Sequence, residues 1–555
     1  MKIAAENTER KTADKLFNFR PMFFAAIFLC LGILFGYCSL ALELSPLWSL
    51  LLLPFLIASL LLCATKEKQR KVMAAWCMLL VFFLLGNLSF SAQIDDFRSM
   101  TAYNKETTVR ARVVDMTSYG EYYNVRFDRL TIDGNTSKAT LSAYLPASFC
   151  ENLRFSDVVL LTGYLSTDNE VFGEYGFRAR DIRENRCYFL SNIESYTKVE
   201  ETFDVFLLIR SRMQDVVYAG MEEGSAAVTM AVLTGDTSGI ESNLYDNIRA
   251  GGIAHVFAVS GLHIGSLYAF CMLFMRKTGL RKLPKAARFF LTAAVLVLYT
   301  GVCGFTASSV RATVVCLVTY ATVLLGVKND FLQSLGISAI LILLLTPTAL
   351  FEVGFQLSFA ACLGLALLTR PIQYAFTSAG KHIKNFFLRI FLKQEPKTSD
   401  ENAPQSLFAR LSRNIVSVLS VSLAAQIATA PILLKSFGYV SGWSLLLNVV
   451  FVPIISGIFA FLLVLVLFAC VTPIAFSEGI LYLPSALWQA LLLVFEAFDF
   501  STFAWTKELS DGAVVIYYVG WLFTTDKWNI SARLKRALAI GCLVAFAVTM
   551  VALSV

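Results

Sequence analysis

The sequence has little charge and almost no histidine. Of its 555 residues only 16% are charged and three are histidine, whereas 57% are hydrophobic. A soluble domain carries about 25% charged and about 45–50% apolar residues, so an ordinary soluble protein is excluded. Three histidines are also too few for a His-rich zinc site. The chain contains neither a GxxxxGK[ST] loop nor a GxSxG turn, which excludes a P-loop motor and the nucleophile turn of the α/β-hydrolases.

The sequence contains many long runs of apolar residues. Each is about 20 residues long, enough to cross the hydrocarbon layer of a membrane, and we expect a polytopic helical bundle of about 10–13 spans. The first run begins at Met22 and is too long for a cleavable signal peptide. The expected spans are 22–43, 47–64, 72–92, 254–275, 289–304, 308–327, 331–346, 349–369, 414–434, 443–470, 481–499, 512–525 and 537–555.

Lysine and arginine predict the orientation, because they stay on the cytoplasmic side of short loops. The N-terminal tail and the stretches 66–71, 276–288, 376–413 and 526–536 are basic. We therefore expect a cytoplasmic N-terminus, with 1–92 forming a tail and three spans, in a multi-pass protein of the cell membrane. Residues 93–253 would then be extracytoplasmic. The net charge of +7 is explained by these loops and is weak evidence for a nucleic-acid-binding stripe.

Residues 93–200 have a different pattern. Short segments such as TVRARVVD and YYNVRFDRLTID alternate with period two, which predicts the strands of a small β-barrel of the OB type. Aromatic residues in these strands are candidates for stacking on the bases of a single strand, or are ordinary core and cross-strand pairs. They are Tyr119, Tyr122, Tyr123, Phe127 and Tyr144.

The β-domain contains two of the twelve cysteines, Cys150 and Cys187. An oxidising exterior would permit a disulfide between them, and two separate thiols are the alternative. The other ten cysteines lie in apolar runs without CxxC spacing and are expected to act as small hydrophobic residues.

We expect residues 201–253 to form an amphipathic, interfacial helix and a linker, and 254–555 to form the polytopic domain. Ionisable and amide side chains in a membrane usually face a bundle interior or a watery cavity. This places a set of candidates along a polar path; ordinary helix packing is the alternative. The candidates are His255, Ser260, Gly261, His263, Arg311, Glu352, Gln356, Gln426 and Asn448. A Ser260–His263 nucleophile pair is conceivable, but we expect no enzyme, no catalytic residue, no metal and no cofactor.

Five segments resemble sequence blocks of the ComEC family. They are HVFAVSGLHIG (255–265), LTGD (233–236), GFTASSVRA (304–312), LFEVGFQLSFAACLGL (350–365) and AQIATAPILLKSFG (425–438), and the resemblance runs from about residue 22 to beyond 453. It implies the inner-membrane channel that passes one DNA strand into the cytoplasm during natural transformation. It also implies an extracytoplasmic OB-type domain, in agreement with the β pattern, and a disulfide there would fit Cys150 and Cys187.

The sequence departs from the family pattern in three places. Ser308 stands where proline is usual, and Glu352 where aspartate is common. Many members also end in a metallo-β-lactamase-like domain, whereas this chain stops at Val555 and lacks the histidines of such a site. We therefore expect a separate nuclease to degrade the other strand, or a sequence that is shorter than the natural chain.

The resemblance also suggests roles for single residues. Gly251 and Gly252 would bend the chain as it enters the membrane, and His255 and His263 would contact the strand. Arg311 would contact phosphate or pair with Glu352.

Because the chain has no motor, we expect a cytoplasmic helicase or translocase as partner. Single-stranded DNA, an extracytoplasmic DNA receptor and membrane lipid are the other expected partners. A transporter of another anionic polymer or lipid-linked substrate, and a membrane scaffold, are the alternatives.

Overall fold

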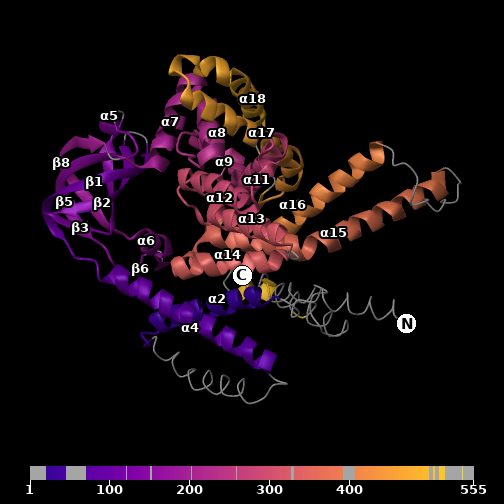
Figure 1. Cartoon of the computed structure of the whole chain (residues 1–555), viewed down its shortest axis with the longest axis horizontal. Helices are drawn as coiled ribbons and strands as arrows, with labels where there is room; N and C mark the ends of the chain where they lie inside the picture. Colours follow the sequence, from indigo (N-terminus) through magenta and orange to yellow (C-terminus); the bar gives the residue numbers. More distant parts are fainter. Residues whose placement is uncertain are drawn as a thin grey trace.

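The protein is described from a computed structural model. The structure describes residues 20–45, 70–391 and 407–506, except for 120–121, 151–152, 175, 202, 258, 327–329, 499 and 501–503. Beyond these it describes 512–514, 516–518 and 541. The barrel lies on one side of a helical bundle, and two long helices, α15 and α16, project from the opposite side (Figure 1).

The predicted β-domain is a closed five-stranded barrel. Its strands follow the order β1-β5-β8-β4-β2, and β1 also pairs with β2, which closes the sheet. All pairs are antiparallel except β4–β8. This is the five-stranded barrel arrangement expected for an OB-like domain. The strands are β1 (Asn104–Tyr119), β2 (Tyr122–Ile132), β4 (Thr140–Pro146), β5 (Asp157–Thr167) and β8 (Arg186–Glu201).

Short elements decorate the barrel. Strand β3 (Asn135–Ser137) extends the β2 hairpin after the left-handed residues Asp133 and Gly134. Helix α5 (Ala147–Cys150) follows β4. A small hairpin of β6 (Phe172–Gly173) and β7 (Gly176–Phe177) precedes α6 (Ala179–Glu184), the helix that faces the bundle.

Cys150 and Cys187 are both free and buried, so the predicted disulfide is wrong. Cys187 lies beside the first residues of β4, because β8 pairs there with Thr140 and Leu141, whereas Cys150 follows the end of that strand. The seven residues of β4 separate them by roughly 20 Å at about 3.3 Å each. A disulfide requires Cα atoms within about 7 Å.

We expect both thiols to remain reduced and slow to react in the folded protein. Burial raises the pKa of the Cys150 thiol to about 11 and that of Cys187 to about 12, and the thiolate is the reactive form. Alkylation without reductant should label both residues after unfolding and leave both largely unlabelled before it. A non-reduced peptide that joins the two would contradict this expectation.

Eight helices in the described part of the chain are long and apolar enough to span a membrane. The expected multi-pass helical bundle with a β-barrel domain is therefore confirmed. The helices are α2 (Pro21–Ala41), α4 (Arg70–Arg98), α12 (Lys285–Val302), α13 (Ala307–Leu325), α15 (Val353–Phe391), α16 (Leu407–Phe437), α17 (Ser444–Val471) and α18 (Ser477–Ala497).

Two expected spans have a different form. Residues 254–275 are divided between α10 (Ala254–Phe257) and α11 (Gly261–Lys277). Helix α14 (Phe331–Leu345) has 15 residues, which is short for a span. The run 47–64 and most of 512–525 and 537–555 lie outside the described residues.

The expected amphipathic helix is α7 (Val205–Gly220). Its buried residues Met213, Val216 and Val217 belong to the bundle core, and it contacts α8, α12, α17 and α18. Helix α8 (Glu223–Thr234) is buried from Ser225 to its last residue. The segment that joins barrel and bundle is therefore an integral part of the bundle.

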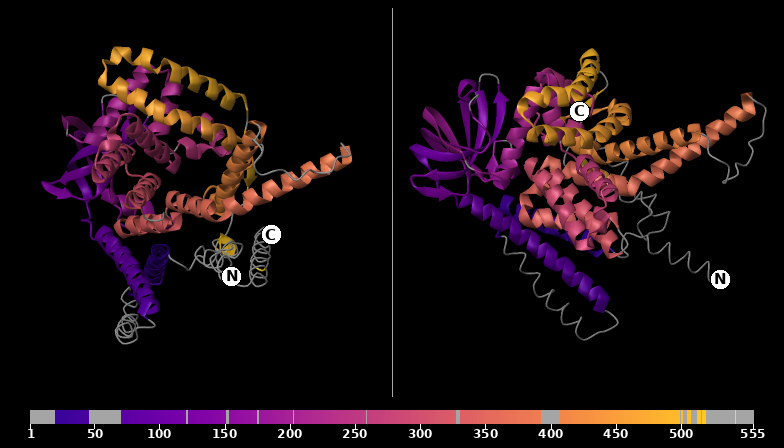
Figure 2. Two further views of the ribbon diagram at one scale, coloured as in Figure 1. Left: turned by 45° about the vertical axis from the view of Figure 1, so that its right-hand side comes forward. Right: turned by 45° about the horizontal axis from the view of Figure 1, so that its top comes forward.

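Short elements complete the bundle and connect its helices. They are α9 (Ser242–Ala250), η3 (Leu280–Lys282), η4 (Pro347–Phe351), η5 (Ile474–Phe476), β9 (Tyr439–Ser441) and β10 (Ala504–Thr506). Figure 2 shows that α17 and α18 cover the side of the bundle opposite the α2–α4 pair.

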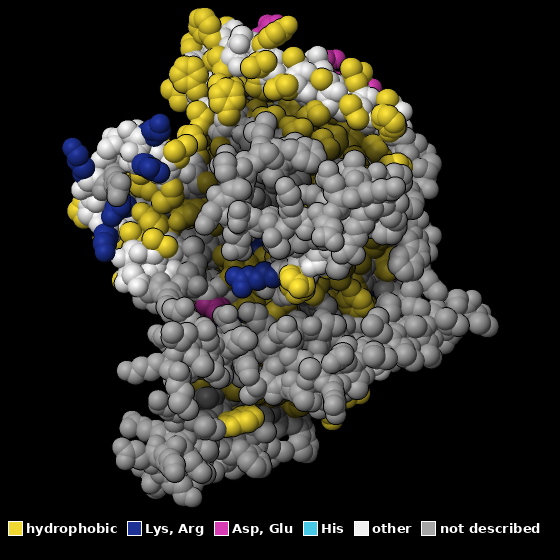
Figure 3. Space-filling model, turned by 90° about the vertical axis from the view of Figure 1, so that its right-hand side faces the viewer, with side chains coloured by type: hydrophobic (Ala, Val, Ile, Leu, Met, Phe, Trp, Pro, Cys, Tyr) yellow, Lys and Arg dark blue, Asp and Glu magenta, His cyan; other side chains and the backbone are white. Residues whose placement is uncertain are grey.

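Large apolar side chains cover the outer surface of α17 and α18 (Figure 3). Phe461, Phe468, Tyr482, Leu483 and Leu493 are each more than half exposed. A surface of this kind is unfavourable in water and suits contact with lipid.

Candidate functional site

The nine candidates of the polar path fall into separate groups in the structure. Ser260, Gly261 and His263 begin α11 and lie close to Arg311 of α13. Gln426 and Asn448 lie at the α16–α17 connection, and Glu352 and Gln356 lie where η4 leads into α15. His255 lies on α10 with an exposed side chain, close enough to His263 to interact with it electrostatically.

The first turn of α11 is closed by a capping box. The Ser260 hydroxyl accepts from the Leu262 N–H at 3.2 Å, and the Nδ1 atom of His263 accepts from the Ser260 N–H at 3.1 Å. This arrangement satisfies backbone donors that a helix start leaves free. Because Nδ1 already accepts a backbone hydrogen bond and lies 3.4 Å from the Ser260 hydroxyl, the pair is poorly arranged as nucleophile and base.

His263 is fully buried and its Nε2 atom has no hydrogen-bond partner among the described residues. Since Nδ1 accepts a hydrogen bond, the neutral ring carries its proton on Nε2. The ring contacts Phe459 of α17, with 4.6 Å between the ring centroids. The site therefore holds a buried donor that is not satisfied in this structure.

Arg311 projects from α13 toward the start of α11. Its Nε donates to the Ser358 hydroxyl at 2.5 Å, and one terminal nitrogen contacts the Cys362 sulfur at 2.8 Å. A Cβ atom on Gly261 would come within 3.2 Å of the other terminal nitrogen, so glycine leaves room for the guanidinium. Arg311 is only 7% exposed.

No carboxylate of the described residues forms an ion pair with Arg311. Its partners are a hydroxyl and a thiol, and Phe359 lies under the guanidinium at 5.9 Å. Buried charges are normally paired, so this is a positive centre that an anion would complete. The N-terminus of α11 adds partial positive charge at the same place.

The block Gly304–Ala312 folds as the turn that directs Arg311. Gly304 and Phe305 adopt left-handed backbone conformations, and Thr306 caps α13 by accepting from the Ser309 N–H. Ser308 is in the first turn of α13, where the usual proline of the family is tolerated because its missing N–H is not needed. Serine in place of proline is therefore compatible with the same start of α13.

Gly251 and Gly252 form the turn between α9 and α10. Gly252 has φ +75°, and a Cβ there would lie 2.6 Å from the Ser444 Cβ. Ser444 in turn accepts from the Asn448 amide, and the Gln426 amide donates to the Ser441 carbonyl. The predicted bend and the two amide candidates thus lie together.

Glu352 does not pair with Arg311. Its carboxylate lies 2.8 Å from Nε of Arg183, which belongs to α6 of the barrel. Gln356 donates to the Leu350 carbonyl and closes the turn between η4 and α15. Glu352 therefore lies at the contact between barrel and bundle.

The stacking candidates of the barrel differ in exposure. Phe127 is fully buried in the core, so the prediction that it stacks on bases is wrong. Tyr123 packs against the same core. Tyr122 is 52% exposed and Tyr144 is 61% exposed. Because Tyr144 pairs with Asn124, two residues from Tyr122, both rings lie on the outer face of β2 and β4.

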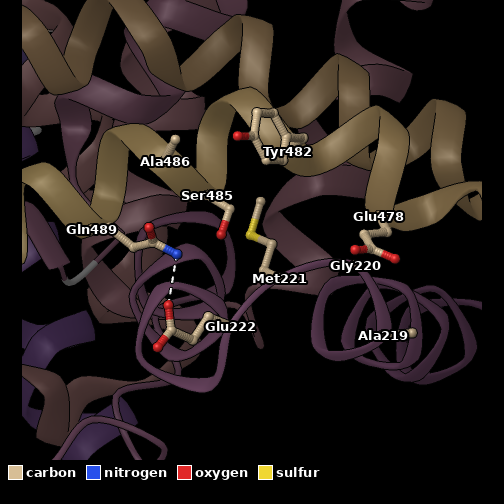
Figure 4. Close-up of a pocket in the computed structure, with 9 residues that line it drawn as sticks. All are labelled: Ala219, Gly220, Met221, Glu222, Glu478, Tyr482, Ser485, Ala486 and Gln489. Atoms are coloured by element: carbon tan, nitrogen blue, oxygen red, sulfur yellow. Dashed lines mark hydrogen bonds between the residues drawn. The ribbon is translucent and has the colours of Figure 1, made fainter.

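Two pockets among the described residues lie away from these candidates. One, of about 370 Å³, lies between the end of α7 and α18, where the Gln489 amide donates to Glu222 at 2.6 Å (Figure 4). The other, of about 540 Å³, is lined by residues of α9 and the end of α18. No group of three or more metal-ligating side chains occurs within the described residues.

Sequence reasoning missed Arg183, Arg210 and Cys362. Arg183 and Arg210 form ion pairs between the barrel and the bundle, and Cys362 contacts Arg311. The only sequence signal for the first two is the charge of Asp115 and Arg126 within predicted strands, because such side chains need partners. A β-bulge after Val113 places Asp115 opposite Arg126, and period-two alternation does not predict it. The thiol contact has no signal in the sequence.

These features define a class: a multi-pass membrane protein with an OB-like barrel and a buried arginine at the start of a broken helix. The family model described as "Competence protein" matches residues 232–529. The chain belongs to this family, which confirms the resemblance drawn from the sequence blocks.

Curated relatives cover parts of the chain. ComE operon protein 3 of Bacillus subtilis is 27% identical over 300 residues, 53% of this chain and 33% of that protein. Uncharacterized protein MG316 of Mycoplasma genitalium is 32% identical over 132 residues, 23% of this chain and 32% of that protein. The match thus spans about a third of the length of each of these relatives. No solved structure matches.

Proposed function

We propose that the protein is a channel that passes single-stranded DNA across the cell membrane into the cytoplasm during natural transformation. The observation that carries the proposal is Arg311, a buried guanidinium without a carboxylate partner among the described residues, placed beside the N-terminus of α11. Phosphate is an anion that both groups favour. Family membership and the name of the Bacillus subtilis relative support competence as the process.

The barrel contributes a second contact. Tyr122 and Tyr144 form an exposed aromatic pair on the β2–β4 face, the face that OB domains use for oligonucleotides. Stacking on such rings is independent of sequence. In the proposed orientation the N-terminus is cytoplasmic and the barrel is extracytoplasmic, so that the barrel meets the strand first.

The channel acts together with other proteins. An inside-negative potential opposes the entry of phosphate by about 2.3 kcal/mol per charge per 100 mV. A cytoplasmic helicase or translocase supplies the work, a receptor outside delivers the DNA, and a separate nuclease removes the other strand. Arg311 and His263 are buried in this structure, so we infer that the passage opens when a strand engages Arg311.

Uptake in a deletion strain complemented by this chain tests the proposal. We expect labelled DNA to become nuclease-resistant inside complemented cells and to stay outside in the deletion strain. Normal DNA uptake in the deletion strain would contradict the proposal. If the deletion strain takes up DNA normally but no longer transports another anionic polymer or lipid-linked substrate, the alternative transporter would be favoured.

A further inference from the structure

A continuous series of ion pairs crosses the contact between barrel and bundle. It starts at Asp236, in the block that follows α8, and ends at Glu352, in the block that begins α15. We call it the charge chain. Its pairs are Asp236–Arg210 (3.1 Å), Arg210–Asp115 (3.7 Å), Asp115–Arg126 (3.4 Å), Arg126–Glu184 (2.6 Å), Glu184–Arg183 (2.9 Å) and Arg183–Glu352 (2.8 Å).

The members of the charge chain come from six separate segments of the sequence. Asp115 and Arg126 belong to neighbouring barrel strands, Glu184 and Arg183 to α6, and Arg210 to α7. Their side chains are between 13% and 31% exposed. Partly buried pairs in a network have a larger effect than isolated pairs on an open surface.

Other contacts fix the same interface. The Arg210 guanidinium lies over the ring of the barrel residue Phe155 at 4.7 Å. Arg112 of β1 contacts Asp204, the residue that caps α7, at 2.8 Å. Burial would raise the pKa of the Glu184 carboxyl, but Arg126 and neighbouring arginines outweigh it and hold the pKa below its usual range.

Both ends of the charge chain lie next to the segments that form the Arg311 site. At one end, a Cβ on Gly235 would lie 3.3 Å from a Val259 methyl carbon, directly before the Ser260 cap of α11. At the other end, Glu352 precedes the α15 turn that carries Ser358, which is about 9 Å further along the helix. Ser358 holds Arg311.

We propose that Asp236 and Glu352 are positioning residues, which hold the barrel in register with the two segments that carry Arg311. This proposal rests on the proposed function in one respect, because the barrel and the Arg311 segments are aligned along the proposed path of the DNA strand. Neither carboxylate touches the strand. The alignment explains why Asp236 and Glu352 both lie in the sequence blocks of the family. It assigns Glu352 to the contact between barrel and bundle, in place of the strand path expected from the sequence.

Hydrogen–deuterium exchange of the full chain in lipid nanodiscs, without DNA, tests the proposal. In Glu352→Gln we expect amides of α6 and of 347–352 to exchange about tenfold faster or more, since the partly buried ion pair with Arg183 is lost. In Asp236→Asn the same increase should occur at 204–212 and 233–240. Exchange in β5 and β8 should stay as in the wild type.

Two further variants complete the design. Glu352→Asp keeps the charge and should retain most of the protection of α6 from exchange. This variant still tests the proposal if Glu352→Gln proves unstable. Asp133→Asn removes a barrel pair outside the charge chain, with Lys105, and should leave the interface unchanged. Unchanged exchange at α6 in Glu352→Gln, or equal acceleration in Asp133→Asn, would overturn the proposal.

DNA uptake by the same variants separates this proposal from the proposed function. We expect Glu352→Gln and Asp236→Asn to lose uptake, and Arg311→Ala to lose uptake without faster exchange at α6. If the chain proves to transport another substrate, the exchange result still decides whether the two carboxylates position the barrel.

Discussion

Replacement of Arg311 by alanine abolishes DNA uptake while the protein still reaches the membrane; this is the largest effect that we expect. Truncating one desolvated charge contact costs about 2–5 kcal/mol, which corresponds to roughly a 30-fold loss or more. A translocating strand meets that loss at each phosphate that passes. Arg311→Lys should recover only part of the activity, because lysine lacks the planar, forked donors that contact Ser358 and Cys362.

The measurement is transformation frequency together with the amount of protein in the membrane fraction. Arg276→Ala is the matched control, because Arg276 lies in the last turn of α11 and its loss removes the same charge at the other end of that helix. Near-normal transformation by Arg311→Ala would remove this residue from the mechanism. Loss of uptake in the Arg276 control to the same degree would indicate a general effect of charge.

Removal of both exposed rings, Tyr122→Ala with Tyr144→Ala, should produce the second largest effect. Base stacking contributes about 1–3 kcal/mol per base, so the double variant should bind single-stranded DNA at least about 30-fold more weakly. The full chain in detergent or nanodiscs and a fluorescent oligothymidine would be used. Each single variant should show an intermediate loss.

Tyr164→Ala provides the control for the pair. Tyr164 is 39% exposed on β5, a strand that does not pair with β2 or β4, and its removal should leave binding unchanged. Equal weakening by all three substitutions would mean that the barrel has been destabilised. Unchanged binding by the double variant would exclude the β2–β4 face as the contact.

Period-two alternation was enough to predict the barrel, because one face of each strand must be buried. The odd spacing of Tyr122 and Phe127 places them on opposite faces of one strand, but the alternation alone did not decide which of the two faces the core. The disulfide failed for a related reason, since the separation of Cys150 and Cys187 depends on how β4 and β8 pair.

Hydropathy identified the membrane helices, because length and apolar composition are local properties. It did not show that residues 254–275 break at Ser260, where a side-chain cap and not a proline starts the second helix. Partners of ionisable residues are non-local. Arg311 and Glu352 are both unusual in apolar runs, but only the fold shows that Glu352 faces Arg183 of the barrel.

The start of α11 inside the protein has a consequence for how a polyanion could move. The favourable field of a helix end falls off within its first turn, and Arg311 adds one cation at the same level. In the proposed channel, attraction is therefore confined to one level, about the height of a helical turn. A single level of this kind would give each phosphate a brief binding position that the next phosphate can take over, so that the polymer advances stepwise and is never held along its whole length.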